Sequence, residues 1–320
     1  MGMRDLSSPP IETLPVRAPF DFDLSLRFLD GFGPMEGEQG VSATHLTKAT
    51  VHRGRSVAYT VWQEAEGAPL CLRIDADAPI PADTRRAVRE RVAFTLGVDE
   101  DLAPFHELAG ADPHFAPLAR ALRGLHHVKF PSPFEAACWA ALNQRVPLAV
   151  ARGMKQALTR RLGGVVVLGG LPYWAFPEAR AVAASDAGEL AALLKNARKT
   201  QAVLAIARAF AAVDERFLNE APLDEVERWL LAIHGVGPFT ASFVLFRGLG
   251  RFRGQPLHPG LLAAAGRVYG RTLSADGFHQ LSRAFGPWGG YFALYLWAST
   301  YLLPQRQAAS TAPISRAMTD

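Results

Sequence analysis

Cysteine is scarce in this sequence of 320 residues, and its scarcity excludes several kinds of site. The chain has only Cys71 and Cys138, which lie far apart and outside any CxxC pair. Two thiols cannot supply the four ligands of a four-cysteine zinc site or an iron–sulfur cluster. We therefore expect no metal and no cofactor, and we interpret both cysteines as small buried side chains in a reducing compartment.

Long hydrophobic runs are also missing. No stretch approaches about 18 apolar residues without a charge, so we expect no membrane-spanning segment. The residues after Met1 lack the apolar core of a signal peptide, so we do not expect secretion. The composition, 49% hydrophobic and 20% charged, is typical of a globular protein. We expect a monomer in the cytoplasm near a bacterial nucleoid, or in the nucleus if the source is eukaryotic.

Acidic residues are absent from a long stretch towards the C-terminus. There is no Asp or Glu between Arg228 and Ala275, and Asp276 is the only acid from there to Thr319. The acid-free stretch contains six arginines, namely Arg228, Arg247, Arg251, Arg253, Arg267 and Arg271. A solvated face usually mixes both signs, whereas unbalanced arginine suits a phosphate backbone. The net charge of +4 is compatible with such a partner.

The chain changes character once along its length. Alternating apolar residues predict strands from about Val16 to Asp77, with a turn at Arg53-Gly54. A helix is predicted from about Asp83 to Leu96, and only helices are predicted from Phe105 onward. The fold class is therefore α+β. We expect a flexible leader (residues 1–15), an α+β N-terminal domain (16–104), an all-helical domain (105–303) and a flexible tail (304–320).

Two of the predicted helices matter most for function. One begins at Ser132-Pro133-Phe134-Glu135, which has the pattern of a capping box with proline at the first helical position. The other has Val226, Trp229, Leu230 and Ile233 on one face and leads directly into a Gly-Val-Gly turn.

That turn lies within the segment Ile233–Ala241, which predicts a helix-hairpin-helix. Gly235 and Gly237 leave no Cβ between the backbone and an approaching surface, and the next helix begins with unpaired amides. Together with Val236 and Thr240, they are expected to bind DNA phosphates through the backbone. The alternative is an ordinary helix corner in which glycine only ends a helix.

The sequence resembles the helix-hairpin-helix (HhH-GPD) DNA glycosylase superfamily, in its 3-methyladenine DNA glycosylase II (AlkA-type) branch, from about Val16 to Leu303. Three separated segments support this resemblance. The matching segments are Ala141–Val146, the hairpin with its following helix from Ile233 to Gly248, and the aromatic stretch that contains Pro287-Trp288, Tyr291 and Trp297. The resemblance implies that the N-terminal region is the TATA-binding-protein-like domain of this branch, followed by the all-α glycosylase domain.

The resemblance also implies that the protein bends double-stranded DNA and flips a damaged base, an alkylated purine, into an aromatic cleft during base-excision repair. Arg145 then stands at the position of the residue that enters the base stack, where the branch usually has a bulky apolar side chain. Arg247 is expected among the DNA contacts. The expected cleft residues are Phe239, Phe243, Tyr291 and Trp297. Enzymes that also cut the strand have a nucleophilic lysine where this chain has Phe239, so the resemblance implies hydrolysis without β-lyase activity.

One departure from the family concerns catalysis itself. The alignment places Pro259, preceded by His258, at the position of the family's catalytic aspartate, and no acid follows before Asp276. A carboxylate there would stabilise the oxocarbenium character of the sugar. Three interpretations remain open. The protein is an active glycosylase that uses another group, with neutral His258 as a weak candidate; a catalytically silent lesion-binding protein; or an enzyme with a remote acid such as Asp276. A structural DNA-binding module without base flipping is a further alternative.

Overall fold

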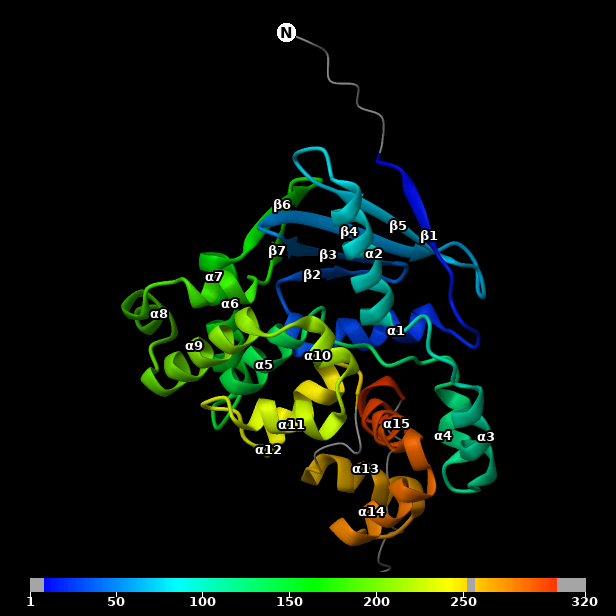
Figure 1. Ribbon diagram of the computed structural model, residues 1–320. Coiled ribbons are helices and arrows are strands. Elements are labelled where there is room, and N and C mark those ends of the chain that lie inside the picture. Colours follow the sequence, from blue (N-terminus) through cyan, green and yellow to red (C-terminus); the bar gives the residue numbers. More distant parts are fainter. Residues whose placement is uncertain (1–8, 252–256, 304–320) are drawn as a thin grey trace, which may run out of the picture.

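The computed structural model describes residues 9–251 and 257–303, so the expected tail lies outside the described residues. An antiparallel sheet forms one end of the molecule and helices form most of the rest (Figure 1). The five strands of this sheet lie in the order β1-β5-β4-β3-β2. The strands are β1 (Ile11–Leu14), β2 (Gln39–Val41), β3 (His45–His52), β4 (Arg55–Gln63) and β5 (Leu70–Asp75).

The central strands confirm the alternating pattern and the predicted turn. Arg53 and Gly54 join β3 to β4 with φ values of 50° and 74°, the left-handed conformation of a two-residue hairpin turn. The side chains of Val57, Tyr59 and Val61 are buried in the main core, as the alternation predicts.

The expectation of a flexible leader over residues 1–15 is wrong for Ile11–Leu14. These four residues form β1, which pairs with β5 from Ile11 opposite Arg73 to Leu14 opposite Leu70. Ile11 and Leu14 are three residues apart and lie between prolines, so the segment shows no alternation from which a strand could be predicted. It nevertheless pairs with the edge of β5.

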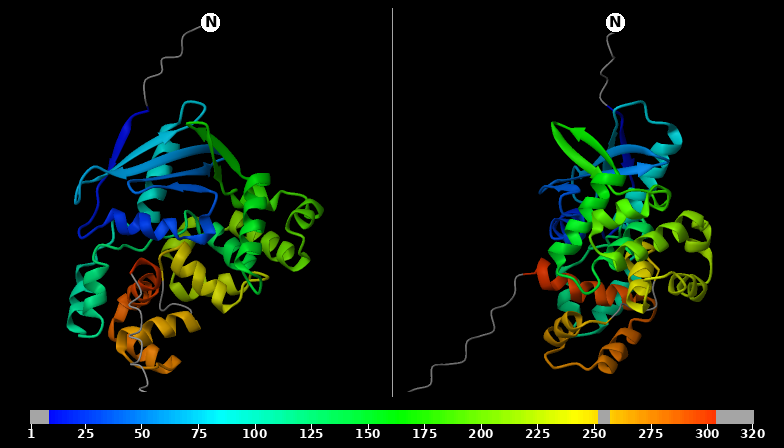
Figure 2. Two further views of the ribbon diagram at one scale, coloured as in Figure 1. Left: turned by 180° about the vertical axis from the view of Figure 1, so that it is seen from behind. Right: turned by 90° about the vertical axis from the view of Figure 1, so that its left-hand side faces the viewer.

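The expectation of an all-helical segment from residue 105 onward is also wrong. β6 (Gly164–Leu168) and β7 (Leu171–Ala175) form a hairpin around Gly169-Gly170, and it packs against β3 and β4. Seen from behind, this hairpin lies beside the main sheet, on the face opposite α2 (Figure 2). Three consecutive valines and a leucine before two glycines are a strand-and-turn signal, because β-branched residues favour strands. The hairpin covers Ala58, which alternation alone would place towards solvent.

Helices connect and cover these strands. The predicted helix from Asp83 is confirmed as α2 (Ala82–Leu96). The helices before the middle of the chain are α1 (Phe22–Asp30), α2, α3 (Ala103–Ala111), α4 (Ala116–Ala121), α5 (Pro133–Leu142) and α6 (Leu148–Leu162), with a 3-10 turn η1 (Gly33–Met35). Then follow α7 (Ala179–Ala183), α8 (Ala187–Leu194), α9 (Ala197–Ala212), α10 (Glu215–Glu220), α11 (Leu223–Leu231) and α12 (Pro238–Phe243). The chain continues through a π-helical segment η2 (Val244–Gly248), α13 (Pro259–Tyr269), α14 (Ala275–Ala284), a 3-10 turn η3 (Gly286–Trp288) and α15 (Gly289–Leu302).

The apolar cores do not follow the expected boundary between residues 104 and 105. One core combines the main sheet and α1 to α4 with the last helices, α13 to α15. The helices α5 to α12 form another core between these two parts of the chain. Helices α1 and α15 contact each other directly, since the Arg27 guanidinium donates to the Leu302 carbonyl and the rings of Phe28 and Tyr301 lie 5.6 Å apart.

A buried ion cluster fixes α5 relative to the sheet. Lys155 of α6 lies 2.5 Å from Glu38 and 2.8 Å from Glu135, the residue at the first turn of α5. Lys48 of β3 lies 3.7 Å from the same Glu38 carboxylate. All four side chains are buried, so each charge depends on its partners for stabilisation. The position of α5 matters because its C-terminal end lies at the candidate site.

Candidate functional site

Helix α5 begins as its sequence predicts and ends in a loop that faces the hairpin. The Ser132 hydroxyl accepts the Glu135 N–H at 3.1 Å, which confirms the predicted N-cap. At the other end, Lys199 of α9 donates to the carbonyls of Ala141 and Gln144, both at 2.6 Å. Burial lowers the pKa of Lys199. Lys199 therefore serves as a C-terminal cap for α5, and its ammonium is already engaged by the protein.

The loop after α5 presents Arg145. This residue is exposed and has a φ of 55°, a left-handed conformation that non-glycine residues adopt mainly in tight turns. The preceding Gln144 fixes the loop to the hairpin, because its side-chain amide donates to the Gly235 carbonyl at 3.2 Å and to the Thr240 hydroxyl at 3.0 Å. Arg145 therefore projects from a loop whose base is held against the hairpin.

Glycine occurs at the two hairpin positions, 235 and 237, for different structural reasons. Gly235 has a φ of 87°, and a Cβ there would lie 2.4 Å from the Ala202 side chain, so only glycine fits. A Cβ at Gly237 would meet open space. Gly237 is the N-cap of α12 and provides no side-chain cap, so the first amides of α12 have no side-chain acceptor there. The side chains of Val236 and Thr240 are buried, which limits their expected DNA contacts to backbone groups.

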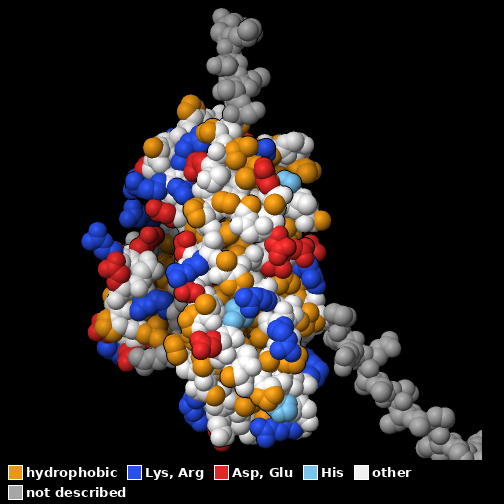
Figure 3. All heavy atoms as spheres, turned by 90° about the vertical axis from the view of Figure 1, so that its right-hand side faces the viewer, with side chains coloured by type: hydrophobic (Ala, Val, Ile, Leu, Met, Phe, Trp, Pro, Cys, Tyr) orange, Lys and Arg blue, Asp and Glu red, His pale blue; other side chains and the backbone are white. Residues whose placement is uncertain are grey.

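These elements enclose a hollow of about 640 Å³, which we call the hairpin hollow. Basic groups dominate it, with Arg145, Arg198, Lys199 and His234 in its wall and no acidic side chain among its described lining residues. The face of the molecule shown in Figure 3 differs, because Lys, Arg, Asp and Glu are intermingled over it. The hairpin hollow therefore favours an anion, and the uncapped backbone amides at the start of α12 suit a phosphate group.

The acid-free arginine run contributes less to this surface than its sequence suggests. Arg247 is buried, with only 5% of its surface exposed, so the expected DNA-backbone contact by its side chain is wrong. Arg251 is occupied by the carbonyls of Leu218 and Ala221. Arg253 lies outside the described residues. The exposed members are Arg228, Arg267 and Arg271.

Aromatic rings form a chain of contacts that begins beside the hairpin. Phe239 is 53% exposed and stacks on Phe243 at a centroid distance of 6.4 Å. Phe243 contacts Phe130 at 5.7 Å, and Phe130 contacts Phe32 at 5.3 Å. Each pair lies within the range of favourable aromatic contacts, so this half of the chain leads continuously from the surface into the interior.

A second series of contacts returns to the surface through α15. Phe28 contacts Tyr301, and Tyr301 contacts Trp297 at 6.1 Å. Trp297 is 38% exposed and lies edge-on to His258 at 5.0 Å. We call the whole set the aromatic arc; its members are Phe239, Phe243, Phe130, Phe32, Phe28, Tyr301 and Trp297. Phe32 and Phe28 themselves stack at 5.9 Å, which joins the two halves.

Tyr291 does not belong to this arc. Its ring is buried in the core with Phe105 and Trp288. Its hydroxyl accepts the His127 N–H at 3.0 Å and donates to the Glu100 carboxylate. The expectation that Tyr291 lines a base cleft is therefore wrong, because its hydroxyl is engaged both as acceptor and as donor inside the core.

His258 and Pro259 begin α13 beside Trp297. Pro259 occupies the first helical position and is exposed, and His258 is the N-cap. The His258 Nδ1 accepts the Leu261 N–H at 3.3 Å, and burial lowers the pKa of the ring. A neutral ring whose Nδ1 accepts carries its proton on Nε2. His258 can therefore donate a hydrogen bond from Nε2. For Nε2 to accept a proton instead, the ring proton would have to move to Nδ1, which would break the hydrogen bond to Leu261. Asp276, the remote acid considered from the sequence, is exposed in the first turn of α14.

Several arc members were not identified from the sequence. Phe28 lies in α1 and Phe32 lies two residues after the end of that helix, whereas Trp297 and Tyr301 lie four residues apart within α15. Within α15 that spacing places the two rings on one side of the helix. The signal shows adjacent rings but does not show that two segments more than 250 residues apart meet.

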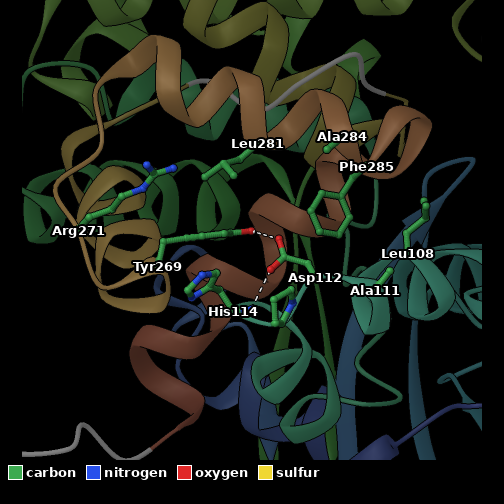
Figure 4. A pocket seen from close by; sticks show the side chains of 10 residues that line it. Leu108, Ala111, Asp112, His114, Tyr269, Arg271, Leu281, Ala284 and Phe285 are labelled. Atoms are coloured by element: carbon green, nitrogen blue, oxygen red, sulfur yellow. Dashed lines mark hydrogen bonds between the residues drawn. The ribbon is translucent and has the colours of Figure 1, made fainter.

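A second hollow, of about 690 Å³, lies between the α3–α4 connection and α13 with α14 (Figure 4). Asp112 projects into it but is occupied, since its carboxylate accepts the Tyr269 hydroxyl at 2.6 Å and the amides of His114 and Phe115. The Tyr269 ring also contacts His114. These contacts give Asp112 a structural role at the end of α13.

The described parts of the chain contain no group of three or more His, Cys, Asp or Glu side chains arranged to hold a metal ion. In residues 9–251 and 257–303, no helix has the length and apolarity that a membrane crossing requires.

Comparison with known proteins finds curated relatives that match most of the chain, although no family model matches it. The DNA-3-methyladenine glycosylase of Bacillus subtilis is 30% identical over 228 residues, which are 70% of this chain and 75% of that protein. A probable bifunctional transcriptional activator/DNA repair enzyme AlkA of Mycobacterium tuberculosis is 25% identical over 89% of this chain. The match covers 56% of that longer protein.

Among solved structures, the 3-methyladenine DNA-glycosylase of Archaeoglobus fulgidus superposes with a TM-score of 0.76. The superposition covers 93% of this chain and 100% of that one at 21% sequence identity. This similarity confirms the predicted α+β glycosylase fold.

Proposed function

The chain belongs to the DNA-3-methyladenine glycosylase family, and we propose that it is a DNA glycosylase that binds duplex DNA, flips a damaged purine and hydrolyses its N-glycosidic bond. We further propose that it acts as a monomer on alkylated purines and has no lyase activity. Phe239 supports the last point, because this position has no amine that could form a Schiff base.

The arrangement of the hairpin hollow and the aromatic arc is the observation that carries this proposal. Phe239 belongs to both, since it lines the hollow and is the first ring of the arc. Phosphates bound at the hollow would hold a strand next to exposed aromatic rings, on which a flipped base can stack. Arg145 projects from the same hollow and is the group we propose to fill the space that the flipped base leaves.

The absence of a carboxylate at position 259 favours substrates whose damaged base leaves the sugar readily. Without a carboxylate at this position, the protein has less charge to stabilise an oxocarbenium ion on the sugar. A purine methylated at N3 or N7 is already cationic and departs as a neutral base. We therefore propose that such lesions are released slowly, with His258 donating a hydrogen bond to an ordered water through Nε2.

Single-turnover incubation with duplexes that contain 3-methyladenine or 7-methylguanine tests the activity. Release of free base above the rate of an undamaged duplex supports the enzyme. Saturable binding to the damaged duplex without release supports the second candidate, a catalytically silent lesion-binding protein, which the missing carboxylate favours. Absence of both would contradict the proposed function.

The position of the missing carboxylate has its own test. Pro259→Asp is expected to raise the release of 7-methylguanine by tenfold or more, because the carboxylate would lie at the exposed start of α13, next to His258, whose ring contacts Trp297. Pro259→Asn is the matched control, since it changes the backbone in the same way without adding charge. Equal rates for the two variants would show that position 259 does not face the sugar.

A further inference from the structure

Gln144, the residue immediately before Arg145, is held through both its side chain and its backbone. Its side-chain Nε2 donates to the Gly235 carbonyl at 3.2 Å and to the Thr240 hydroxyl at 3.0 Å. Its backbone carbonyl accepts from the Lys199 ammonium at 2.6 Å. Gln144 therefore joins the end of α5 both to the hairpin and to α9.

The hairpin, α5 and α9 also pack directly on one another. A Cβ at Gly235 would lie 2.4 Å from the Cβ of Ala202, so the hairpin turn lies against α9. Val236 and Ala202 belong to the same apolar core. Helix α5 contacts both α9 and α12. The uncapped amides of α12 and the Arg145 loop are therefore carried by one block of packed elements.

The backbone of Arg145 depends on its neighbours. Its φ of 55° is left-handed, a conformation that persists in a non-glycine residue where the surrounding structure holds it. Val146, on the other side, is partly buried and packs against two apolar cores. Arg145 is thus an exposed residue between two anchored ones, and the Gln144 amide is the anchor that reaches the hairpin.

We propose that Gln144 is a positioning residue that couples phosphate binding at the hairpin to the entry of Arg145 into the base stack. This inference rests on the proposed function, in which the hairpin binds phosphates and Arg145 fills the space of the flipped base. The amide bridge fixes the spacing between these two groups, so docking of the hairpin on the DNA backbone delivers Arg145 to the stack in the same step. The loop is ordered when the protein folds, which spares base flipping that entropic cost.

The bridge depends on the donors of the amide and not on its size. Both partners of Nε2 are acceptor oxygens, one on a carbonyl and one on a hydroxyl. Gln144→Met keeps the length of the side chain but donates no hydrogen bond. Lys199 and Val146 still hold the loop in this variant, and water can reach the exposed Gly235 carbonyl, so we expect the protein to fold.

Binding and unstacking measured on the same variant separate the two coupled steps. Gln144→Met is expected to bind an undamaged duplex with a Kd within about twofold of wild type, because the hairpin amides are unchanged. At saturating protein, the fluorescence rise of 2-aminopurine placed beside 7-methylguanine should fall by about fivefold or more. Gln280→Met, the same change at an exposed position of α14, is the matched control. A fluorescence rise equal to that of wild type would overturn the inference.

A double-mutant cycle tests whether Gln144 acts through its neighbour. Because no plug remains to be positioned in Arg145→Ala, adding Gln144→Met to it should lower the 2-aminopurine signal no further. Losses that multiply in the double variant would contradict the coupling. A loss in Gln144→Met that is equally large for binding to undamaged duplex, and that accompanies a lower thermal unfolding midpoint, would show that the bridge is purely structural.

The outcomes separate this inference from the proposed function. Wild-type protein that unstacks the 7-methylguanine duplex, with Gln144→Met unstacking it equally well, retains the proposed function and refutes the role of Gln144. Wild-type protein that neither binds nor unstacks that duplex refutes the proposed function and this inference with it.

Discussion

The position of the Lys199 side chain cannot be inferred from its neighbours in sequence. It lies in the basic group of Lys195, Arg198 and Lys199, where charge alone fits either a phosphate contact or a solvated helix face. The structure turns its ammonium inward to the last carbonyls of α5. Arg198, the adjacent residue, remains exposed in the hairpin hollow. Sequence cannot distinguish the two, because the difference depends on which side of α9 faces α5.

Lys199 and Arg198 should differ in their contributions, Lys199 to the stability of the fold and Arg198 to DNA binding. Lys199→Met should lower the free energy of unfolding by about 2 kcal/mol, since two carbonyls lose a charged donor. Arg198→Met should leave unfolding unchanged and weaken binding to any duplex several-fold, because it removes one phosphate contact. Urea unfolding and duplex titration at fixed salt would measure both. A stable Lys199→Met protein with weak DNA binding would reverse the assignment.

At the residue scale, the predictable features were those set by local chemistry. Ser132 caps α5 because its hydroxyl accepts the Glu135 N–H at the start of the helix, and the Ser-Pro-Phe-Glu pattern is sufficient to predict this cap. Arg247 and Tyr291 could not be placed in this way. Both lie in helical stretches where burial depends on elements distant in sequence, and each was expected at the DNA or base surface.

At the scale of elements, the hairpin is the feature that sequence predicted best. Helix α11, the turn and α12 lie where the Gly-Val-Gly pattern indicates, because glycine and proline determine the local backbone. The β6–β7 hairpin was missed, since its strands are short and interrupt a long helical region. The sheet that it covers comes from much earlier in the chain, and no local pattern records that contact.

The two hairpin glycines should respond differently to the same change. Gly235→Ala is expected to destabilise the protein by several kcal/mol, because its φ is left-handed and the new Cβ would overlap Ala202. Gly237→Ala should fold normally. Thermal unfolding measures this contrast, and similar midpoints for both would contradict the left-handed turn at Gly235.

Gly237 can then be used to test the phosphate contact without disturbing the fold. Gly237→Asp should weaken binding to damaged and undamaged duplexes alike, since the added charge opposes the backbone and not a base. Gly237→Asn provides the neutral control. Unchanged affinity for the Asp variant at low salt would show that the hairpin is not the anchor.

At the scale of the whole molecule, acid should weaken the fold through its buried histidines. His127 lies in the core, where burial holds its pKa well below the usual value, and its ring stacks on Phe246 at 4.1 Å. Below about pH 6.5 the unfolded chain binds a proton that the folded protein excludes, so stability decreases as pH falls. The decrease attributable to this residue is about 1.4 kcal/mol per pH unit.

Urea unfolding of wild type and His127→Gln between pH 7.5 and pH 5 would isolate that contribution. The difference in unfolding free energy between the two proteins should shrink steadily as the pH is lowered. A constant difference would mean that His127 is protonated in the folded protein, or that it remains unprotonated in the unfolded chain.

The core shared by the sheet and the last helices has a consequence during synthesis. The main sheet is complete when Asp75 has been added, but α15, which packs into the same core, ends at Leu302. At roughly 5–20 residues per second, the ribosome needs on the order of ten to fifty seconds to make the intervening chain. During that interval the middle helices can assemble their own core, while the side of α1 that contacts α15 waits for its last partner. A chaperone that binds exposed apolar surface would therefore be needed most before translation ends, and least once α15 has emerged.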